Sequence, residues 1–507
     1  MKTINIMNFV RQNDHRLPAH SDILYRTTEA ELALVNAYEV ENTFLLQYDA
    51  FCDERFVKLF REKATPHTEL GVWYEIVEPL TSACGLPYRS EKGWKWDWHI
   101  VPGFSMAYSP KEREWLIDET MRKFKEVFGT YPRTIASWLF DTHTLNYLAD
   151  HYDISAVAIC RDQRNTDAYT LVGGYFNQAY YPSRNNLFTP AQTAAYRVPV
   201  PMFRLLGSSP IHNYDDKKYY SPQMAAQHGC ATLEPVWYSG AHEACVDWFF
   251  KTYFENEDLG FSYAQLGQEN SFGEHDLITP LRMQIEKALQ LKDVRIEKMC
   301  DTGEAFKKAF PEKTPATAVT ALDNWDDEDI QSVYYDCQNY VANLFRYEGY
   351  TFIRALYLFD ERVEEHYLTR TCTTFDAVYE NLPLVDTVVG YAQERRECGL
   401  MIDTQGEAFT VQKTAEEALT ASWAAHTVTF EPDAITVKAP KLYFYAARQP
   451  AQIVCEGQAL AYRYKGVQYR LRVENAQIFP CVNGDFEIIP SEGTCKLYPE
   501  RDGRQFG

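Results

Sequence analysis

Between residues 134 and 167, two short apolar runs flank a segment whose apolar residues recur at helical spacing. The runs at 135–140 and 154–160 predict strands, and the segment between them predicts a helix. Asp141 follows the first run directly, and Asp162 follows the second after one intervening residue. Strands joined through a helix are parallel, so both acids are expected at the same edge of one sheet.

The same alternation of strand-like and helical segments fills the first half of the chain. This alternation predicts a mostly parallel sheet, and the number of repeats suits a (β/α)7-like barrel better than an open sheet. In a barrel of this kind the site lies at the carboxyl ends of the strands. The further predicted strands are 4–9, 43–48, 70–74, 200–206, 231–237 and 262–267.

The pattern changes after about residue 310, where the segment PEKTP at 311–315 indicates a linker. Beyond it, short runs rich in Val, Tyr, Phe and Thr alternate with turn residues, for example at 427–430, 434–437 and 462–473. Such runs are typical of an antiparallel β-sandwich. We therefore predict a barrel domain at 1–312 and a C-terminal β-sandwich at 313–507.

Charge and cysteine usage restrict the partners and the compartment. The formal net charge of −21 argues against a nucleic-acid or anionic-membrane partner, because such partners require a cluster of Lys and Arg. No apolar run is long enough to span a membrane. The 12 Cys form no CxxC pair, and the first residues are too polar for a signal peptide. We expect a cytoplasmic protein.

Carboxylates lie in or just after several predicted strands, and on one barrel they would converge on one mouth. A pair of carboxyl groups, one ionised and one protonated, is the minimum needed to cleave a glycosidic bond. The alternative for each acid is a structural role, as a helix cap or a core acceptor. The acids are Asp49, Glu75, Asp141, Asp162, Glu234 and Glu269.

Aromatic and polar residues near these acids are candidates for binding a carbohydrate substrate. Aromatic faces stack on sugar rings and their polar tips suit a wet cleft, although core packing is the alternative for each of them. Charge-assisted hydrogen bonds to hydroxyls would orient the sugar. Besides Asp49, Glu75 and Asp162, the candidates are Trp96, Asp97, Trp138, Gln163, Asp167, Tyr180, Tyr181, Arg184 and Trp237.

Metal and cofactor motifs do not occur in the sequence. The His residues form no HxH, HxxxH or HExxH pair, and Cys and His do not cluster at zinc-site spacings. There is no GxSxG elbow and no Gly-rich phosphate loop. We expect no transition metal and no cofactor.

Two segments carry a resemblance to known enzymes. WLFD at 138–141 resembles the Trp-x-x-Glu or Trp-x-x-Asp motif at the end of the fourth barrel strand in family 57 and family 38 glycoside hydrolases. The motif acid is the nucleophile in those enzymes, which implies that role for Asp141. GQEN at 267–270 is similar to a late-strand motif of family 57, with Glu269 kept.

The resemblance extends to polysaccharide deacetylases, but with departures. Asp49 matches their base, whereas Ala50 stands in place of a metal-binding acid. Trp73 and Val77 occupy the positions of two metal-binding His residues. The metal pair of family 38 also has no counterpart at 8–14.

The whole chain resembles more closely a bacterial family named glycoside hydrolase/deacetylase, in which a barrel precedes a β-sandwich. The blocks LLQYDAF, CRDQRNTDAYTLVGGY, YYPSRNNLFTPAQ, TLEPVW and GQENSF carry this resemblance.

We therefore predict a metal-independent glycoside hydrolase. Asp141 is the predicted nucleophile or base, Glu269 the predicted acid, and Glu234 the alternative acid. On this hypothesis Asp141→Asn nearly abolishes turnover and leaves folding intact. A sugar deacetylase and a non-catalytic carbohydrate-binding protein are the alternatives.

Overall fold

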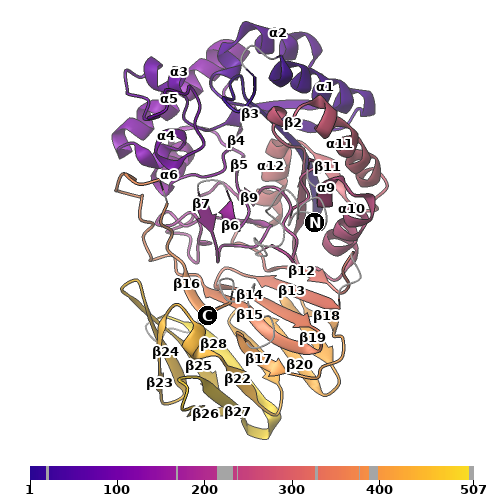
Figure 1. Ribbon diagram of the computed structural model, residues 1–507, viewed down its shortest axis with the longest axis vertical. Coiled ribbons are helices and arrows are strands. Elements are labelled where there is room, and N and C mark those ends of the chain that lie inside the picture. Colours follow the sequence, from indigo (N-terminus) through magenta and orange to yellow (C-terminus); the bar gives the residue numbers. More distant parts are fainter. Residues whose placement is uncertain are drawn as a thin grey trace.

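The computed structural model describes residues 1–18, 22–166, 169–213, 232–236, 238–325, 329–375, 377–387 and 398–501. In Figure 1 a barrel of strands and helices forms the upper part of the molecule, and packed antiparallel sheets form the lower part. The predicted barrel followed by a β-sandwich is confirmed.

The barrel sheet has the strand order β10–β1–β2–β3–β4–β5–β9–β8, with β11 beside β1. All the pairings are parallel except that of β8 with β9. Between β9 and β10, the Gln265 side chain accepts a hydrogen bond from the Leu206 amide, so the barrel is nearly closed. The strands are β1 (Lys2–Val10), β2 (Asn42–Leu46), β3 (Thr68–Trp73), β4 (Thr134–Ala136), β5 (Ala156–Ile159), β8 (Ala179–Tyr180), β9 (Met202–Arg204), β10 (Ser262–Leu266) and β11 (Arg295–Glu297).

Helices cover the outside of the barrel (Figure 1). The sequence specifies α5 clearly, because Ser109 and Glu112 form a capping box and Gly129 ends the helix with a φ of 85°. Among the described residues, no helix is long and apolar enough to cross a membrane. The helices are α1 (Ile23–Tyr38), α2 (Glu54–Lys63), α3 (Glu78–Ala83), α4 (Ile100–Gly103), α5 (Pro110–Phe128), α6 (Thr142–His151), α9 (Tyr238–Ala241), α10 (Glu243–Phe250), α11 (Glu274–Ala288) and α12 (Met299–Ala309).

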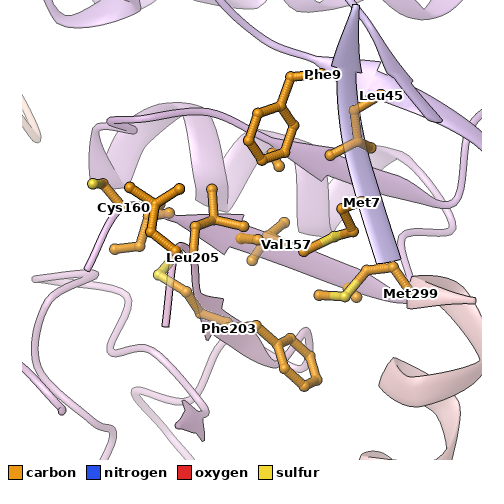
Figure 2. Packing of buried hydrophobic residues seen from close by; sticks show 14 of the residues in the cluster. Met7, Phe9, Leu45, Val157, Cys160, Phe203, Leu205 and Met299 are labelled. Carbon is orange, nitrogen blue, oxygen red and sulfur yellow. The ribbon is translucent and has the colours of Figure 1, made fainter. Parts of the chain in front are cut away.

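The barrel interior is filled by apolar side chains rather than by a channel. Met7 and Phe9 of β1 lie near Val157, Phe203 and other residues from the opposite strands (Figure 2). All four side chains have no exposed surface. Burial of one such side chain stabilises the fold by about 1.5–3 kcal/mol, so this core holds the strand ends in fixed positions.

Two antiparallel sheets make up the sandwich, in the orders β12–β13–β14–β15–β17–β22–β27–β26 and β18–β19–β20–β21–β28–β25–β24–β23. Strand β16 pairs with β15, and the small hairpin β6 (Gln163–Thr166) and β7 (Tyr169–Leu171) forms a sheet of its own. The sandwich strands are β12 (Thr317–Ala321), β13 (Ile330–Asp336), β14 (Tyr340–Tyr347), β15 (Tyr350–Leu358), β16 (Leu382–Asp386), β17 (Leu400–Asp403), β18 (Thr410–Ala415), β19 (Ala418–Trp423), β20 (His426–Glu431), β21 (Ala434–Lys438), β22 (Leu442–Phe444), β23 (Gln452–Glu456), β24 (Ala459–Tyr464), β25 (Val467–Glu474), β26 (Ala476–Pro480), β27 (Phe486–Pro490) and β28 (Thr494–Glu500).

Two strand predictions need correction. The run 462–473 is not one strand but parts of β24 and β25, because Lys465 and Gly466 both have positive φ and form a tight turn. The run predicted at 231–237 forms no strand at 232–236, where only Thr232 makes an isolated bridge to Ser208. The predicted boundary at 312/313 falls between α12 and β12.

The sandwich holds the barrel through a long excursion between β15 and β16, whose residues 360–375 we call the strap. The Arg113 guanidinium on α5 donates to the carbonyls of Tyr367 (2.6 Å) and Arg370 (2.5 Å) in the strap. The amide of Cys372 donates to the Met106 carbonyl of the barrel at 2.7 Å. These bonds seat the strap beside α4 and α6 (Figure 1).

Glu365 also binds the strap to the barrel, since its carboxyl accepts a hydrogen bond from the Thr142 amide at the start of α6 (2.7 Å). Burial, together with the nearby Asp141 carboxylate, raises the pKa of Glu365 to about 8. The folded protein therefore binds this proton more tightly than the unfolded chain does. The resulting stabilisation is complete below about pH 4 and is lost as the pH rises to about 8.

The variant Glu365→Gln tests this linkage. Gln keeps the acceptor for Thr142 but carries no charge at any pH. We expect the variant to match the wild type near pH 4 and to exceed its free energy of unfolding by about 1 kcal/mol or more above pH 8. Urea titrations at the two pH values measure the difference, and a difference that does not change with pH would contradict the expectation.

Candidate functional site

The carboxyl ends of β10, β1, β2 and β3 lie side by side in the barrel sheet, and polar side chains follow each of them. We call Arg11, Asp49, Glu75, Trp96 and Glu269 the mouth cluster. All five side chains are buried. Parallel strands end at one edge, so residues distant in sequence meet at this mouth.

Arg11 lies between two acids of the mouth cluster. Its guanidinium donates to Glu75 through Nε (3.1 Å) and Nη2 (3.2 Å), and to Glu269 through Nη1. Glu75 also accepts from the Trp96 indole (2.9 Å) and the Gln47 amide (2.6 Å). Every oxygen of Glu75 thus has a donor, and the two acids are held at fixed positions.

The segment GQEN at 267–270 explains how Glu269 reaches Arg11. Gly267 has a φ of 94°, and a Cβ there would stand 2.3 Å from the Met7 carbonyl, so the close approach to β1 requires glycine. Asn270 binds the backbone of Arg11 in both directions, accepting from its amide (3.1 Å) and donating to its carbonyl (2.8 Å). Glu269 is therefore aligned with the end of β1.

Glu269 is held as an ionised carboxylate. It accepts hydrogen bonds from Arg16 (3.0 Å) and Ser271 (2.6 Å) in addition to Arg11. Burial alone raises the pKa of Glu269, but the two guanidinium groups outweigh burial and hold that pKa below its usual value. An ionised carboxylate has no proton to donate at neutral pH, which argues against the acid role of Glu269, and that role stays a prediction.

Asp49 has the opposite environment. Its side chain is 6% exposed and accepts a long hydrogen bond of 3.4 Å from the Gln12 amide. Burial raises the pKa of Asp49 to about 7, because this bond and the charge of Arg11 only partly offset the loss of water. Asp49 can therefore both give and take a proton near neutral pH.

Glu234 is connected to the segment that carries Glu269. It accepts hydrogen bonds from the side-chain amide of Gln268, the neighbour of Glu269, and from the Thr232 hydroxyl (2.6 Å). Glu234 is half-buried, unlike the mouth cluster. Gln268 thus links the Glu234 carboxylate to the backbone of Glu269, whose amide donates to the Gln268 side-chain oxygen (2.8 Å).

Asp141 has the contacts of a helix cap. Its side chain has no exposed surface and accepts from the Thr144 amide (2.9 Å), the Ser105 hydroxyl (2.5 Å) and Arg113 (2.8 Å). Although burial raises the pKa of Asp141, these donors hold it below its usual value. Both oxygens face protein donors, which favours the structural alternative, and the nucleophile role of Asp141 stays a prediction.

Several other predicted binding residues also serve the protein itself. Asp162 accepts from Arg204 (2.6 Å) and from the Gly173 and Gly174 amides, and so fixes a turn. Tyr180 is buried and donates to the Leu187 carbonyl. Tyr181 is also buried and packs on Phe306, and Arg184 forms an ion pair with Asp150. The substrate-binding roles of these residues stay predictions.

Trp96 is buried in the mouth cluster, whereas Trp138 is half-buried. Trp96 lies beneath the Arg11 guanidinium, 4.2 Å from its carbon, and binds Glu75. Trp138 is half-buried and packs edge-on against Phe9 (5.4 Å between centroids) at the top of the core. Asp97 accepts from Ser90 and His99. The predicted residues Asp167 and Trp237 lie outside the described residues.

Arg11, Asp14 and Arg16 are not among the site residues predicted from the sequence. The Asp14 carboxylate accepts hydrogen bonds from the side chain and the amide of Arg16, and Arg16 in turn reaches Glu269. The sequence feature that indicates these residues is a cluster of polar residues at 11–14, directly after an apolar strand. The candidate acids were identified by the same pattern.

A metal is implied by the deacetylase resemblance, and the donor set does not fit one. Ala50 has no ligand atom, Trp73 stacks on Phe9 at 4.2 Å, and Val77 is buried. Within the described ranges, no group of three or more His, Cys, Asp or Glu could hold an ion. The reaction that we consider for the mouth cluster therefore uses protein side chains alone.

Comparisons with solved structures agree with this fold. A Parabacteroides distasonis protein described as a glycoside hydrolase/deacetylase matches with a TM-score of 0.54 and 13% identity, over 74% of this chain and 89% of that chain. Proteins from Mycobacterium smegmatis and Pseudomonas aeruginosa, described as polysaccharide deacetylases, match with TM-scores of 0.34 and 0.38. They are 12% and 11% identical, and each covers 61% of this chain and 91% or 93% of its own.

No family model matches the sequence, and no curated protein matches it significantly. At these identities the likeness concerns the fold alone. The resemblance to families 57 and 38 stays a prediction.

Proposed function

We propose that this protein is a hydrolase that acts on a carbohydrate by acid–base chemistry at the mouth cluster. The observation that supports this most is the contrast between two buried carboxyl groups. The pKa of Asp49 is raised to about 7, whereas two guanidinium groups hold the pKa of Glu269 below its usual value. Carboxyl groups whose pKa values are pushed apart are the usual acid and base of hydrolytic sites.

Unpartnered polar atoms at the strand ends support a polyhydroxyl substrate. The Gln47 carbonyl oxygen, the Trp73 indole nitrogen and the Gln163 amide nitrogen are buried and have no hydrogen-bond partner among the described residues. A buried polar atom without a partner costs about 1–3 kcal/mol, so these atoms need a water or a ligand. A sugar can satisfy them, because each hydroxyl both donates and accepts.

Glycoside hydrolysis is the reaction that we favour. Protonated Asp49 would donate its proton to the leaving-group oxygen as the glycosidic bond breaks, and ionised Glu269 would stabilise the positive charge that develops on the sugar carbon. A water would then add to that carbon and return its proton to Asp49. Arg11 would keep Glu269 in place through the reaction. The name of the Parabacteroides distasonis protein, which shares the fold, includes this activity.

A sugar deacetylase is the second candidate, because Asp49 stands where the deacetylase pattern has its base. In this reaction ionised Asp49 would take the proton of a water that attacks the acetyl carbonyl. A pKa near 7 suits a base as well as an acid.

The pH dependence of kcat/KM separates the two reactions. If Asp49 is the acid, activity falls as the pH rises through about 7, because the carboxyl loses its proton. If Asp49 is the base, activity falls as the pH drops through about 7. In the Asp49→Asn variant the change of kcat/KM near pH 7 should disappear. If the change remains in the variant, another group causes it.

A substrate screen of the purified protein is the first experiment. Chromogenic glycosides report glycosidic cleavage, and acetylated oligosaccharides report acetate release. Release of the aryl group would support the glycoside hydrolase, and release of acetate alone would support the deacetylase. Binding of sugars without either product would support the non-catalytic alternative and contradict our proposal.

A further inference from the structure

Aromatic rings form a rim beyond the mouth cluster. Trp94 stacks on His15 with 3.4 Å between ring centroids, and Trp98 stacks on His99 at 4.1 Å. Phe375 stands edge-on to His99 at 5.5 Å. We call these five residues the aromatic rim.

The rim is continuous with the mouth cluster through Trp96. His15 makes a 3.2 Å hydrogen bond to the Trp96 carbonyl, and the Trp96 indole binds Glu75. On the other side of Trp96, Asp97 accepts from the His99 ring (2.5 Å). Trp96 and Asp97 therefore join the aromatic rim to the mouth cluster.

Phe375 is the part of the rim that the β-sandwich contributes, since it lies at the end of the strap. Its side chain is 51% exposed, although it belongs to a type that is usually buried. The bonds from Arg113 and Met106 hold the strap against the barrel. The ring of Phe375 is thus kept at a defined position relative to the mouth.

The buried ion pair of Arg113 and Asp141 also positions the strap. Arg113 donates simultaneously to Asp141 and to two carbonyls of the strap. Such a buried pair contributes little to stability compared with an apolar replacement. It does fix the geometry between α5, α6 and the strap, and so the position of Phe375.

We propose that the aromatic rim is a subsite for a linear oligosaccharide that extends out of the mouth, and that Phe375 makes the protein prefer chains over single sugars. The inference rests on the carbohydrate substrate of the proposed function. Sugar rings present C–H faces to aromatic rings and hydroxyls to polar tips. The rim provides both, because the Phe375 ring is 51% exposed and the ammonium of the exposed Lys92 lies 4.4 Å from the Trp94 ring.

Calorimetric titration of the full-length protein tests the subsite. The probes are cello-, chito-, xylo- and manno-oligosaccharides, from the monosaccharide to the hexasaccharide of each series. We expect the affinity to rise with chain length in one series. Phe375→Ala should weaken hexasaccharide binding by about three- to tenfold and leave monosaccharide binding unchanged.

The matched control is Phe479→Ala on β26, since Phe479 is 43% exposed but lies in the outer hairpin of the sandwich. This variant should bind every probe as the wild type does. Equal hexasaccharide affinity of Phe375→Ala and wild type, or no gain with length in any series, would overturn the subsite.

The same titration with Asp49→Asn distinguishes the subsite from the reaction. Suppose that longer chains bind more tightly, that this gain requires Phe375, and that no probe is hydrolysed by the wild type. This result would refute the proposed reaction and support the subsite. Hydrolysis with no dependence on Phe375 would keep the reaction and refute the subsite.

Discussion

Replacing Asp49 with Asn is expected to lower kcat by roughly 10²–10⁴-fold, the usual contribution of a positioned acid or base. The amide has nearly the same shape and cannot exchange a proton. Because burial raises the pKa of Asp49 to about 7, the charged form is unfavourable in the fold. The variant should therefore be at least as stable as the wild type above pH 7, in urea titrations.

Asp53→Asn is the control for this variant. Asp53 begins α2 a few residues later and is 19% exposed, and its carboxyl accepts from the Arg55 amide at 2.8 Å. Asn caps helices as well as Asp does, so both activity and stability should stay close to the wild type. Wild-type turnover in Asp49→Asn would exclude Asp49 from the chemistry.

Replacing Asp141 with Asn is expected to lower the free energy of unfolding by about 3–5 kcal/mol, because it leaves the buried Arg113 without its counter-ion. The folded fraction of the variant should keep its turnover, since Asp141 has no exposed surface through which to meet a substrate. Urea titration gives the stability, and activity corrected for the folded fraction gives the turnover.

The comparison with Asp53→Asn isolates the effect of the buried charge. Both substitutions exchange an Asp helix cap for Asn, but only Asp141 is fully buried and paired with a buried arginine. A fully stable Asp141→Asn without turnover would instead restore the role predicted from the WLFD segment.

The sequence pattern located the acids better than it assigned their roles. Asp49, Glu75 and Glu269 follow separate strands, and the alternation of strands and helices suffices to bring such residues to one mouth. The same pattern selected Asp141 and Asp162, which also follow strands. At those two positions the carboxylates are fully occupied by protein donors.

The difference arises from partners that are remote in sequence. Arg11 meets Glu269 across 258 positions, and Arg113 contacts the strap across 254. A local motif contains no information about such partners, yet they decide whether a buried carboxyl is ionised, protonated or purely structural.

The sequence by itself determined the barrel, the sandwich and the edge at which the acids gather, because hydrophobic periodicity and chain order dictate which strands can pair. Only the tertiary structure decided which acids keep a labile proton. That property depends on burial and on the distance to charges, and both follow from packing between segments that the chain order leaves far apart.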